Sequence, residues 1–124
     1  MSDLQQAEPG PGRSAESDFK SHGFNRAILE SLSFGVALQD IESGAFLDCN
    51  TAGLKLLGVD SLDEVCGRLP ADFSPGYQTD GGDSRTLAEQ RLREVTETGS
   101  SRFEWTLQRH NGEQFTVEVT LSRV

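Results

Sequence analysis

Two stretches near the C-terminal end alternate apolar and polar residues with a period of two, which is typical of β-strands with one buried face. In the first, Phe103, Trp105 and Leu107 alternate with polar residues. The second has the same alternation, and its apolar residues are Phe115, Val117, Val119 and Leu121. The pattern predicts a long hairpin whose apolar residues share one buried face.

In both strands the apolar residues occupy odd-numbered positions, and this shared parity determines the length of the turn between them. A two-residue turn at 111–112 would place Leu107 opposite Thr116, so that apolar and polar side chains shared a face. A three-residue loop at 110–112, with Gly112 in the left-handed conformation, places Leu107 opposite Phe115 instead. We predict this register, which also pairs Trp105 with Val117 and Phe103 with Val119.

Shorter patterns upstream predict small helices and a second hairpin. Apolar residues at helical spacing predict a lead-in helix over 24–32, and short apolar runs predict strands over 36–39 and 45–49. Asn50 suits the start of a helix that ends at Gly58. A capping box at Ser61 predicts another short helix that ends at Gly67.

The segment 68–83 is rich in Gly and Pro, with Leu69, Phe73 and Tyr77 as its apolar anchors, and we predict a mobile loop. Ser84 is a suitable cap for the longest helix, which is predicted over 84–98. Its buried stripe consists of Leu87, Ala88, Leu92 and Val95.

Composition divides the chain into residues 1–22, a flexible N-terminal tail poor in apolar groups, and residues 23–124, one domain. The 20 acidic and 11 basic residues give a formal charge of -9, which argues against nucleic acid and membrane-surface partners. The sequence has no apolar run of membrane-spanning length and no signal peptide. Two widely separated cysteines fit a reducing compartment, so we expect a cytoplasmic location.

Several motifs, taken in order, resemble the PAS domain family over residues 24–124. The sequence Ile28-Leu29-Glu30-Ser31-Leu32 precedes the first strand, and Asp48-Cys49-Asn50-Thr51-Ala52 leads into the first small helix. The remaining carriers of the resemblance are Leu56-Leu57-Gly58, Glu64-Val65-Cys66-Gly67, Phe103-Glu104-Trp105, Asn111-Gly112 and Val117-Glu118-Val119. The resemblance implies an α+β fold, in which short helices and one longer helix flank an antiparallel sheet of nominally five strands and enclose a pocket.

The last strand of that family pattern is absent from the sequence, which stops at Val124. In the family this strand lies between the strands that correspond to 115–121 and 36–39. Either the sequence is a piece of a longer chain or another segment fills the slot. We expect direct pairing of the two neighbours, or a strand borrowed from a second copy, to cover the open edges.

The cofactor signatures of the family are also absent, so we expect no cofactor. Flavin photoreceptors carry an Asn-Cys-Arg-Phe run where this chain reads Gly67-Arg68-Leu69-Pro70. Haem-binding members use a histidine on or near the long helix, and residues 84–98 contain none. No motif for catalysis or metal binding is present, so we expect neither a catalytic nor a metal site.

Four residues are candidates for lining a pocket: Arg91, Trp105, Tyr77 and Phe73. Arg91 interrupts the apolar stripe of the long helix and either clamps a ligand carboxylate or extends its head to water. Trp105 offers a ring and an N–H donor to a ligand, although an inward aromatic on a strand is usually core. Asn50 is explained by capping, and the two cysteines by apolar packing.

Three functions fit these observations. The first is a sensory input and dimerisation module in a bacterial signal-transduction protein, such as a two-component system, where it regulates a fused histidine kinase or diguanylate cyclase. We expect such a module to be a cytoplasmic homodimer and not an enzyme. The alternative is a binding module for a metabolite or anion without a tightly bound cofactor, and the third is a scaffold that pairs with another protein.

Overall fold

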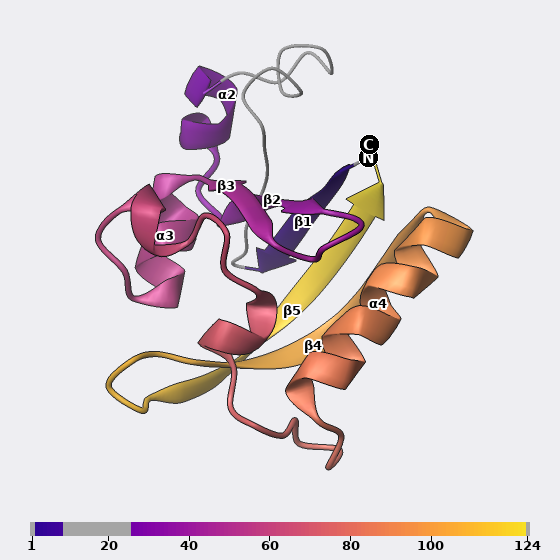
Figure 1. Cartoon of the computed structure of the whole chain (residues 1–124). Coiled ribbons are helices and arrows are strands. Elements are labelled where there is room, and N and C mark those ends of the chain that lie inside the picture. The colour runs from indigo at the N-terminus through magenta and orange to yellow at the C-terminus, as the bar shows by residue number, and fades with distance from the viewer. Residues whose placement is uncertain (1, 9–25, 124) are drawn as a thin grey trace.

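The computed structural model describes residues 2–8 and 26–123, which form a five-stranded antiparallel sheet with helices packed on it (Figure 1). The strands lie in the order β3-β2-β1-β5-β4. Their bounds are Ser2–Glu8 for β1, Val36–Asp40 for β2, Phe46–Cys49 for β3, Ser100–Gln108 for β4 and Gln114–Arg123 for β5. This is the predicted α+β arrangement of an antiparallel sheet, short helices and one longer helix.

The β4–β5 hairpin has the register predicted from apolar parity. Leu107 lies opposite Phe115, Trp105 opposite Val117 and Phe103 opposite Val119. The amide of Arg109 donates to the carbonyl of Glu113 over 2.9 Å, which leaves residues 110–112 as the loop. Gly112 has a φ of 92°, the left-handed conformation that a three-residue loop requires. The apolar residues of both strands therefore join one core cluster.

The slot between β5 and β2 is occupied by β1, which pairs antiparallel with both neighbours. The prediction of a flexible tail over 1–22 is therefore wrong for Ser2–Glu8, while the rest of that stretch lies outside the described residues. The two expected ways of covering the slot, direct pairing and a borrowed strand, are replaced by a strand from the same chain. Backbone hydrogen bonds on both edges explain how so polar a segment joins the sheet.

Of the helical segments that the structure describes, four lie within their predicted ranges, whereas the 3₁₀ turn at 70–73 lies in the segment predicted to be a loop. The segments are α2 (Arg26–Ser31), α3 (Thr51–Leu57), two 3₁₀ turns η1 (Leu62–Glu64) and η2 (Pro70–Phe73), and α4 (Ser84–Thr98). Asn50 caps α3 as predicted, and Gly58 ends it with a φ of 77°. The cap of α4 is Asp83 and not Ser84, because the Asp83 carboxylate accepts from the amide of Thr86 at 2.9 Å.

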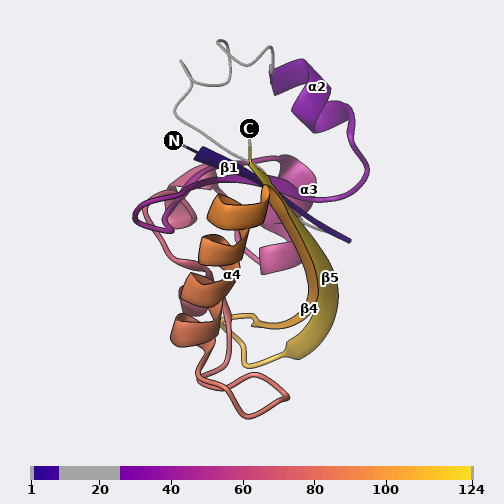
Figure 2. The same cartoon turned by 90° about the vertical axis from the view of Figure 1, so that its right-hand side faces the viewer.

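Both faces of β2 are covered. Val36 and Leu38 form a cluster with Leu29 of α2, whereas Ala37 lies in a different cluster with Phe46 and other inner residues. Figure 2 shows β4 and β5 curving around α4, which lies on the concave side of the sheet. Gln39 follows Leu38 in the alternation and so belongs to the inner side with Ala37. The strand therefore places one amide side chain toward the enclosed interior.

The loop between η2 and α4 is attached to the sheet by polar contacts. Gln78 is buried, and its side-chain oxygen accepts from the amide of Thr106 at 2.8 Å while its nitrogen donates to the Ser84 hydroxyl at 2.9 Å. Phe73 is buried as an anchor, but Tyr77 is 70% exposed, so its predicted anchoring role is wrong. The mobility of the loop stays a prediction.

Candidate ligand-binding site

A small cavity of about 40 Å³ lies between α4 and the inner face of the sheet. Its walls are almost entirely apolar, with Phe46, Leu57 and Val119 among them, and its polar residues are Gln39 and Arg91. A space of this size holds a few water molecules, since each needs at least about 10–15 Å³. The cavity as it stands is therefore smaller than the pockets that accept whole metabolites.

Three of the four predicted pocket candidates line this cavity: Phe73, Arg91 and Trp105. They come from η2, α4 and β4, so the fold brings together residues that are far apart in sequence. Tyr77 does not line it, and the exposed position of Tyr77 places its ring on the surface. Ligand binding by the other three stays a prediction.

The guanidinium of Arg91 already has partners. Its Nη1 atom lies 3.2 Å from a Glu94 carboxylate oxygen, and its central carbon lies 4.6 Å from the centre of the Phe103 ring. The side chain is half-buried, so its stem packs while its head pairs with a carboxylate at the surface. An anionic ligand at Arg91 would have to compete with Glu94.

Trp105 acts mainly as a core residue in this arrangement. Its side chain is buried, and its indole N–H donates to the Ser74 hydroxyl over 2.9 Å. The ring lies edge-on to Phe103, with ring centres 5.9 Å apart. A ligand can contact the face of the Trp105 ring, but the indole N–H group is already paired.

Gln39 is the residue that sequence reasoning missed. Its side chain is 3% exposed, and its Nε2 atom donates to the Gly44 carbonyl over 2.8 Å. Its Oε1 atom has no hydrogen-bond partner among the residues that the structure describes. Buried acceptors are usually paired, so this oxygen marks a place where a partner is missing. The signal available in the sequence is a polar residue at an inward position, directly after the apolar run Val36, Ala37 and Leu38.

A larger groove adjoins the cavity. It has a volume of about 310 Å³ and lies between α4, the β2–β3 turn and the start of η2. Gln39, Pro70 and Ala88 line both spaces, so the wall between them contains the Gln39 amide, which is paired at its nitrogen only among the described residues. The groove is within the size range of small-molecule sites.

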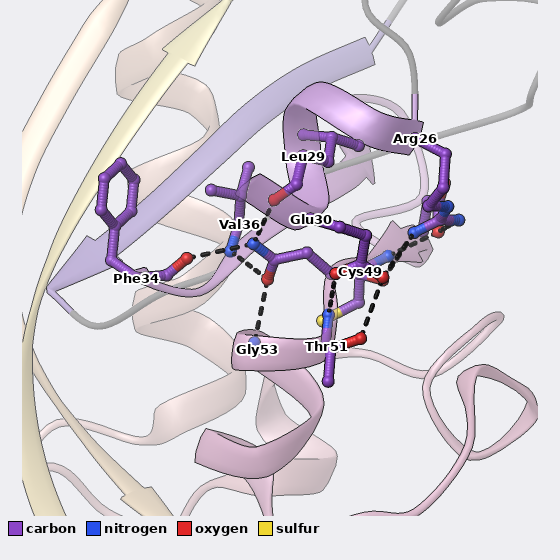
Figure 3. Close-up of polar contacts among 10 residues, drawn as sticks. Arg26, Leu29, Glu30, Phe34, Val36, Cys49, Thr51 and Gly53 are labelled. Carbon is purple, nitrogen blue, oxygen red and sulfur yellow. Dashed lines mark hydrogen bonds and ion pairs between the residues drawn. The ribbon is translucent and has the colours of Figure 1, made fainter. Parts of the chain in front are cut away.

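A second polar centre, formed by the side chain of Asn50, joins α2 to the sheet. Figure 3 labels its backbone partners Leu29, Phe34, Val36 and Gly53. The Asn50 oxygen accepts from the amides of Val36 at 2.8 Å and Gly53 at 2.9 Å. Its nitrogen donates to the carbonyls of Leu29 at 2.9 Å and Phe34 at 3.0 Å. This fully buried side chain therefore connects α2, β2 and α3, and every hydrogen-bonding position of its amide is used.

Two surface residues of α2 strengthen this connection. Arg26 donates to the Asp48 carboxylate at 2.6 Å and to the Cys49 carbonyl at 3.2 Å. Glu30 accepts from both the amide and the hydroxyl of Thr51, at 2.7 and 2.9 Å. The lead-in helix is thus attached at the junction of β3 and α3.

The cysteines have the character of packed thiols. Burial, together with the charge of Asp48, raises the pKa of the Cys49 thiol far above its ordinary value. Burial, followed by the charges of Asp48 and Asp63, also raises the pKa of Cys66. Both therefore stay protonated at neutral pH, which disfavours nucleophilic or redox chemistry. Among residues 2–8 and 26–123, no group of three or more potential metal ligands is found.

Comparison with known proteins agrees with this geometry. Residues 24–93, more than half of the 124-residue chain, match the family model described as PAS domain. The chain belongs to the PAS domain family. The match confirms the recognition made from the sequence motifs. A PAS domain is itself non-catalytic. No curated protein matches the sequence.

Among solved structures, this PAS domain is similar to a domain of the sensory box sensor histidine kinase/response regulator from Geobacter sulfurreducens. The two share 24% sequence identity with a TM-score of 0.61, over 87% of this chain and 96% of that chain. At this identity the likeness shows the fold, and it confirms the predicted fold class. Within the described part of the chain, no helix is both long and apolar enough to span a membrane.

Proposed function

We propose that this PAS domain is the sensory input module of a bacterial signal-transduction protein, and that it regulates a fused histidine kinase or diguanylate cyclase. The observation that carries the proposal is the attachment of α2 through Asn50. A signal must leave a sensory domain through an element at its edge, and α2 is such an element. Its attachment to β2 and α3 gives movements of the sheet a direct route to that helix.

The mechanism follows from the geometry of this attachment. Asn50 contacts α2, β2 and α3 together, so a shift of β2 relative to α3 cannot leave all four of its hydrogen bonds intact. Loss of any of them leaves a buried polar group unpaired, which is costly. Displacement of α2 with the sheet is therefore favoured over local distortion.

We further propose that the domain acts in the cytoplasm as a homodimer, with α2 and the sheet at the interface. Ile28 on α2 is 48% exposed, which supports an apolar contact at this helix. Sedimentation equilibrium of the wild-type protein and of Ile28→Glu tests the dimer. We expect the variant to be more dissociated, and a wild-type protein that is monomeric at high micromolar concentration would contradict the proposal.

A chimera tests the regulatory function. The chain replaces the PAS domain of a histidine kinase, and autophosphorylation is measured for wild type and for Arg26→Ala, which removes the contact of α2 with Asp48. We expect a change of about five-fold or more, the lower range of allosteric coupling. Arg102→Ala is the matched control, because it also removes one arginine–carboxylate pair but lies on the β4–β5 surface. Equal activity of all three proteins would refute the proposal.

The alternative function is a small-molecule binding module, and the groove beside Gln39 favours it. Native mass spectrometry of the purified protein is the test that separates the two. A retained metabolite supports the binding module, whereas an empty protein supports signalling through the dimer alone. If the retained metabolite is an anion bound by Arg91, the mass spectrum of Arg91→Met should no longer contain it.

A further inference from the structure

We propose that the groove between α4 and the β2–β3 turn binds a neutral small molecule with an apolar body, and that an N–H or O–H group of this ligand donates to Gln39 Oε1. The inference deepens the proposed function, because the ligand would be the signal that the domain senses.

The orientation of the Gln39 amide is determined by its neighbour. The Gly44 carbonyl can only accept, so the amide nitrogen must be the atom that lies 2.8 Å from it. A flipped amide would place two acceptors against each other. Oε1 is therefore the atom left without a partner among the described residues.

Water cannot satisfy this oxygen in the present conformation. The oxygen is buried, so solvent in the groove and in the inner cavity does not reach it. An unpaired buried acceptor is unfavourable. A hydrogen-bond donor of a ligand can reach the oxygen if α4 and the β2–β3 turn separate slightly, and it then removes this penalty. Ligand binding therefore stabilises the open conformation of the groove.

The surroundings of the oxygen select the chemistry of the donor. Gln39, Gly44 and Leu92 are the buried residues of the groove, and none of them carries a charge. A cationic donor would lie there without a counter-charge, and an anion would face a carbonyl oxygen. Charged side chains gather at the exposed rim instead, from Glu42, Arg85, Glu89 and Arg93. A neutral donor on an apolar body is the group that fits.

Three elements of the groove wall come together at Gly44. The nearest atoms to a side chain built on Gly44 are Gln39 Nε2 at 3.7 Å, Leu69 Cδ2 at 3.7 Å and Leu92 Cδ2 at 3.8 Å. The turn, α4 and the start of η2 thus meet at the amide of Gln39. A ligand between them contacts all three elements, and the β2–β3 turn connects it to the strand that carries Val36 and the Asn50 centre.

Two isosteric probes test the inference: indole, which has an N–H donor, and benzofuran, which has an oxygen atom in its place. Each is titrated into the ¹⁵N-labelled wild-type protein and into Gln39→Met, and amide shifts are followed by NMR. In wild type we expect indole to shift the amides of Gly44 and Leu92 and to bind about tenfold more tightly than benzofuran. Gln39→Met should bind both probes equally.

The probe comparison in wild type does not depend on any variant folding. Equal affinity of the two probes, no binding of either, or shifts confined to another part of the protein would each overturn the proposal. Failure here is distinguishable from failure of the proposed function. If Arg26→Ala still changes the activity of the chimeric kinase, only the ligand class is wrong, whereas discrimination between the probes without any effect of Arg26→Ala leaves the binding site intact.

Discussion

Asn50 and Gln39 both have amide side chains buried in the same domain, yet the two amides differ in how many hydrogen bonds they make. The Asn50 amide makes four hydrogen bonds to four backbone groups. The Gln39 amide makes one, to Gly44, and its oxygen is left unpaired among the described residues. The first amide holds three elements together, while the second lies at the wall between a cavity and a groove.

The contrast separates structural from functional polar residues. A buried amide with every position used has no capacity for a ligand, and its role is to fix the relative positions of the elements that it contacts. A buried amide with an unused acceptor is destabilising unless something else binds there. Burial of a polar residue is therefore a poor guide to function until its hydrogen bonds are counted.

The largest expected effect is that of Asn50→Ala. The change removes the side-chain partner of backbone groups of Phe34, Val36 and Gly53 and leaves the Leu29 carbonyl with the Leu32 amide alone, so we expect a loss of about 3–5 kcal/mol in the free energy of unfolding. Urea denaturation measures it. Asn111→Ala, in the exposed hairpin loop, is the control and should cost much less. A loss below about 1 kcal/mol at Asn50 would remove the contrast with Gln39.

Gln78→Met should have the next largest effect. Gln78 resembles Asn50 because its amide is paired at both atoms, with the backbone of Thr106 and the Ser84 hydroxyl. We expect a loss of about 2–3 kcal/mol, together with faster amide exchange in the loop before α4. Denaturation and hydrogen exchange measure the two. Unchanged exchange in the loop would show that Gln78 does not attach it to β4.

Gln39→Met makes the same chemical change at the half-paired site and should cost less. It removes the hydrogen bond to Gly44 but also removes an unpaired buried oxygen, and the two effects oppose each other. We expect a change within about 1 kcal/mol of wild type. A loss as large as that of Gln78→Met would mean that Oε1 has a partner in solution even without ligand.

The smallest effect concerns Asp83, which caps α4 from the surface as Asn50 caps α3 from the interior. Hydrogen bonds from the amide and hydroxyl of Thr86 lower the pKa of Asp83 below its ordinary value of 3.8. Its ionised form therefore stabilises the fold above that value, and this contribution is lost as pH falls through the lowered pKa. Asp83→Asn keeps a cap but does not titrate.

We therefore expect the thermal midpoint of wild type to fall relative to that of Asp83→Asn as the pH is lowered from 5 toward 2.5. Differential scanning calorimetry at intervals of half a pH unit checks this. A constant difference between the two proteins across the range would show that the carboxylate contributes nothing beyond what an amide cap supplies.

Apolar parity and capping preferences were enough to predict much of the fold. The register of β4 and β5 follows from parity, because a shift of one residue would turn Trp105 and Val117 to opposite faces. Asn50 was recognised as a cap for a similar reason, since Asn at a helix start has a known local use. These features depend on near neighbours in the sequence, which is why the sequence predicts them.

The features that were missed depend on distant partners. Gln39 Oε1 lacks a partner among the described residues, and this depends on the elements that pack around it, which no local pattern encodes. Gln78 lies in a segment whose Gly and Pro content predicts a loop, but its partner Thr106 is on β4. The chemistry of Phe73, Arg91 and Trp105 suggests pocket residues, but the cavity that they share depends on the packing of η2, α4 and β4.

The central strand β1 has a consequence for how the chain can be rearranged. Asp3 of β1 lies opposite Arg123 of β5, so the start of the first strand and the end of the last are neighbours in an antiparallel ladder (Figure 1). A turn of about two to five residues could join them as a hairpin. In such a circular permutant, opened between β1 and α2, the central strand would follow β5 in the chain, and the sheet would keep its order and every backbone pairing.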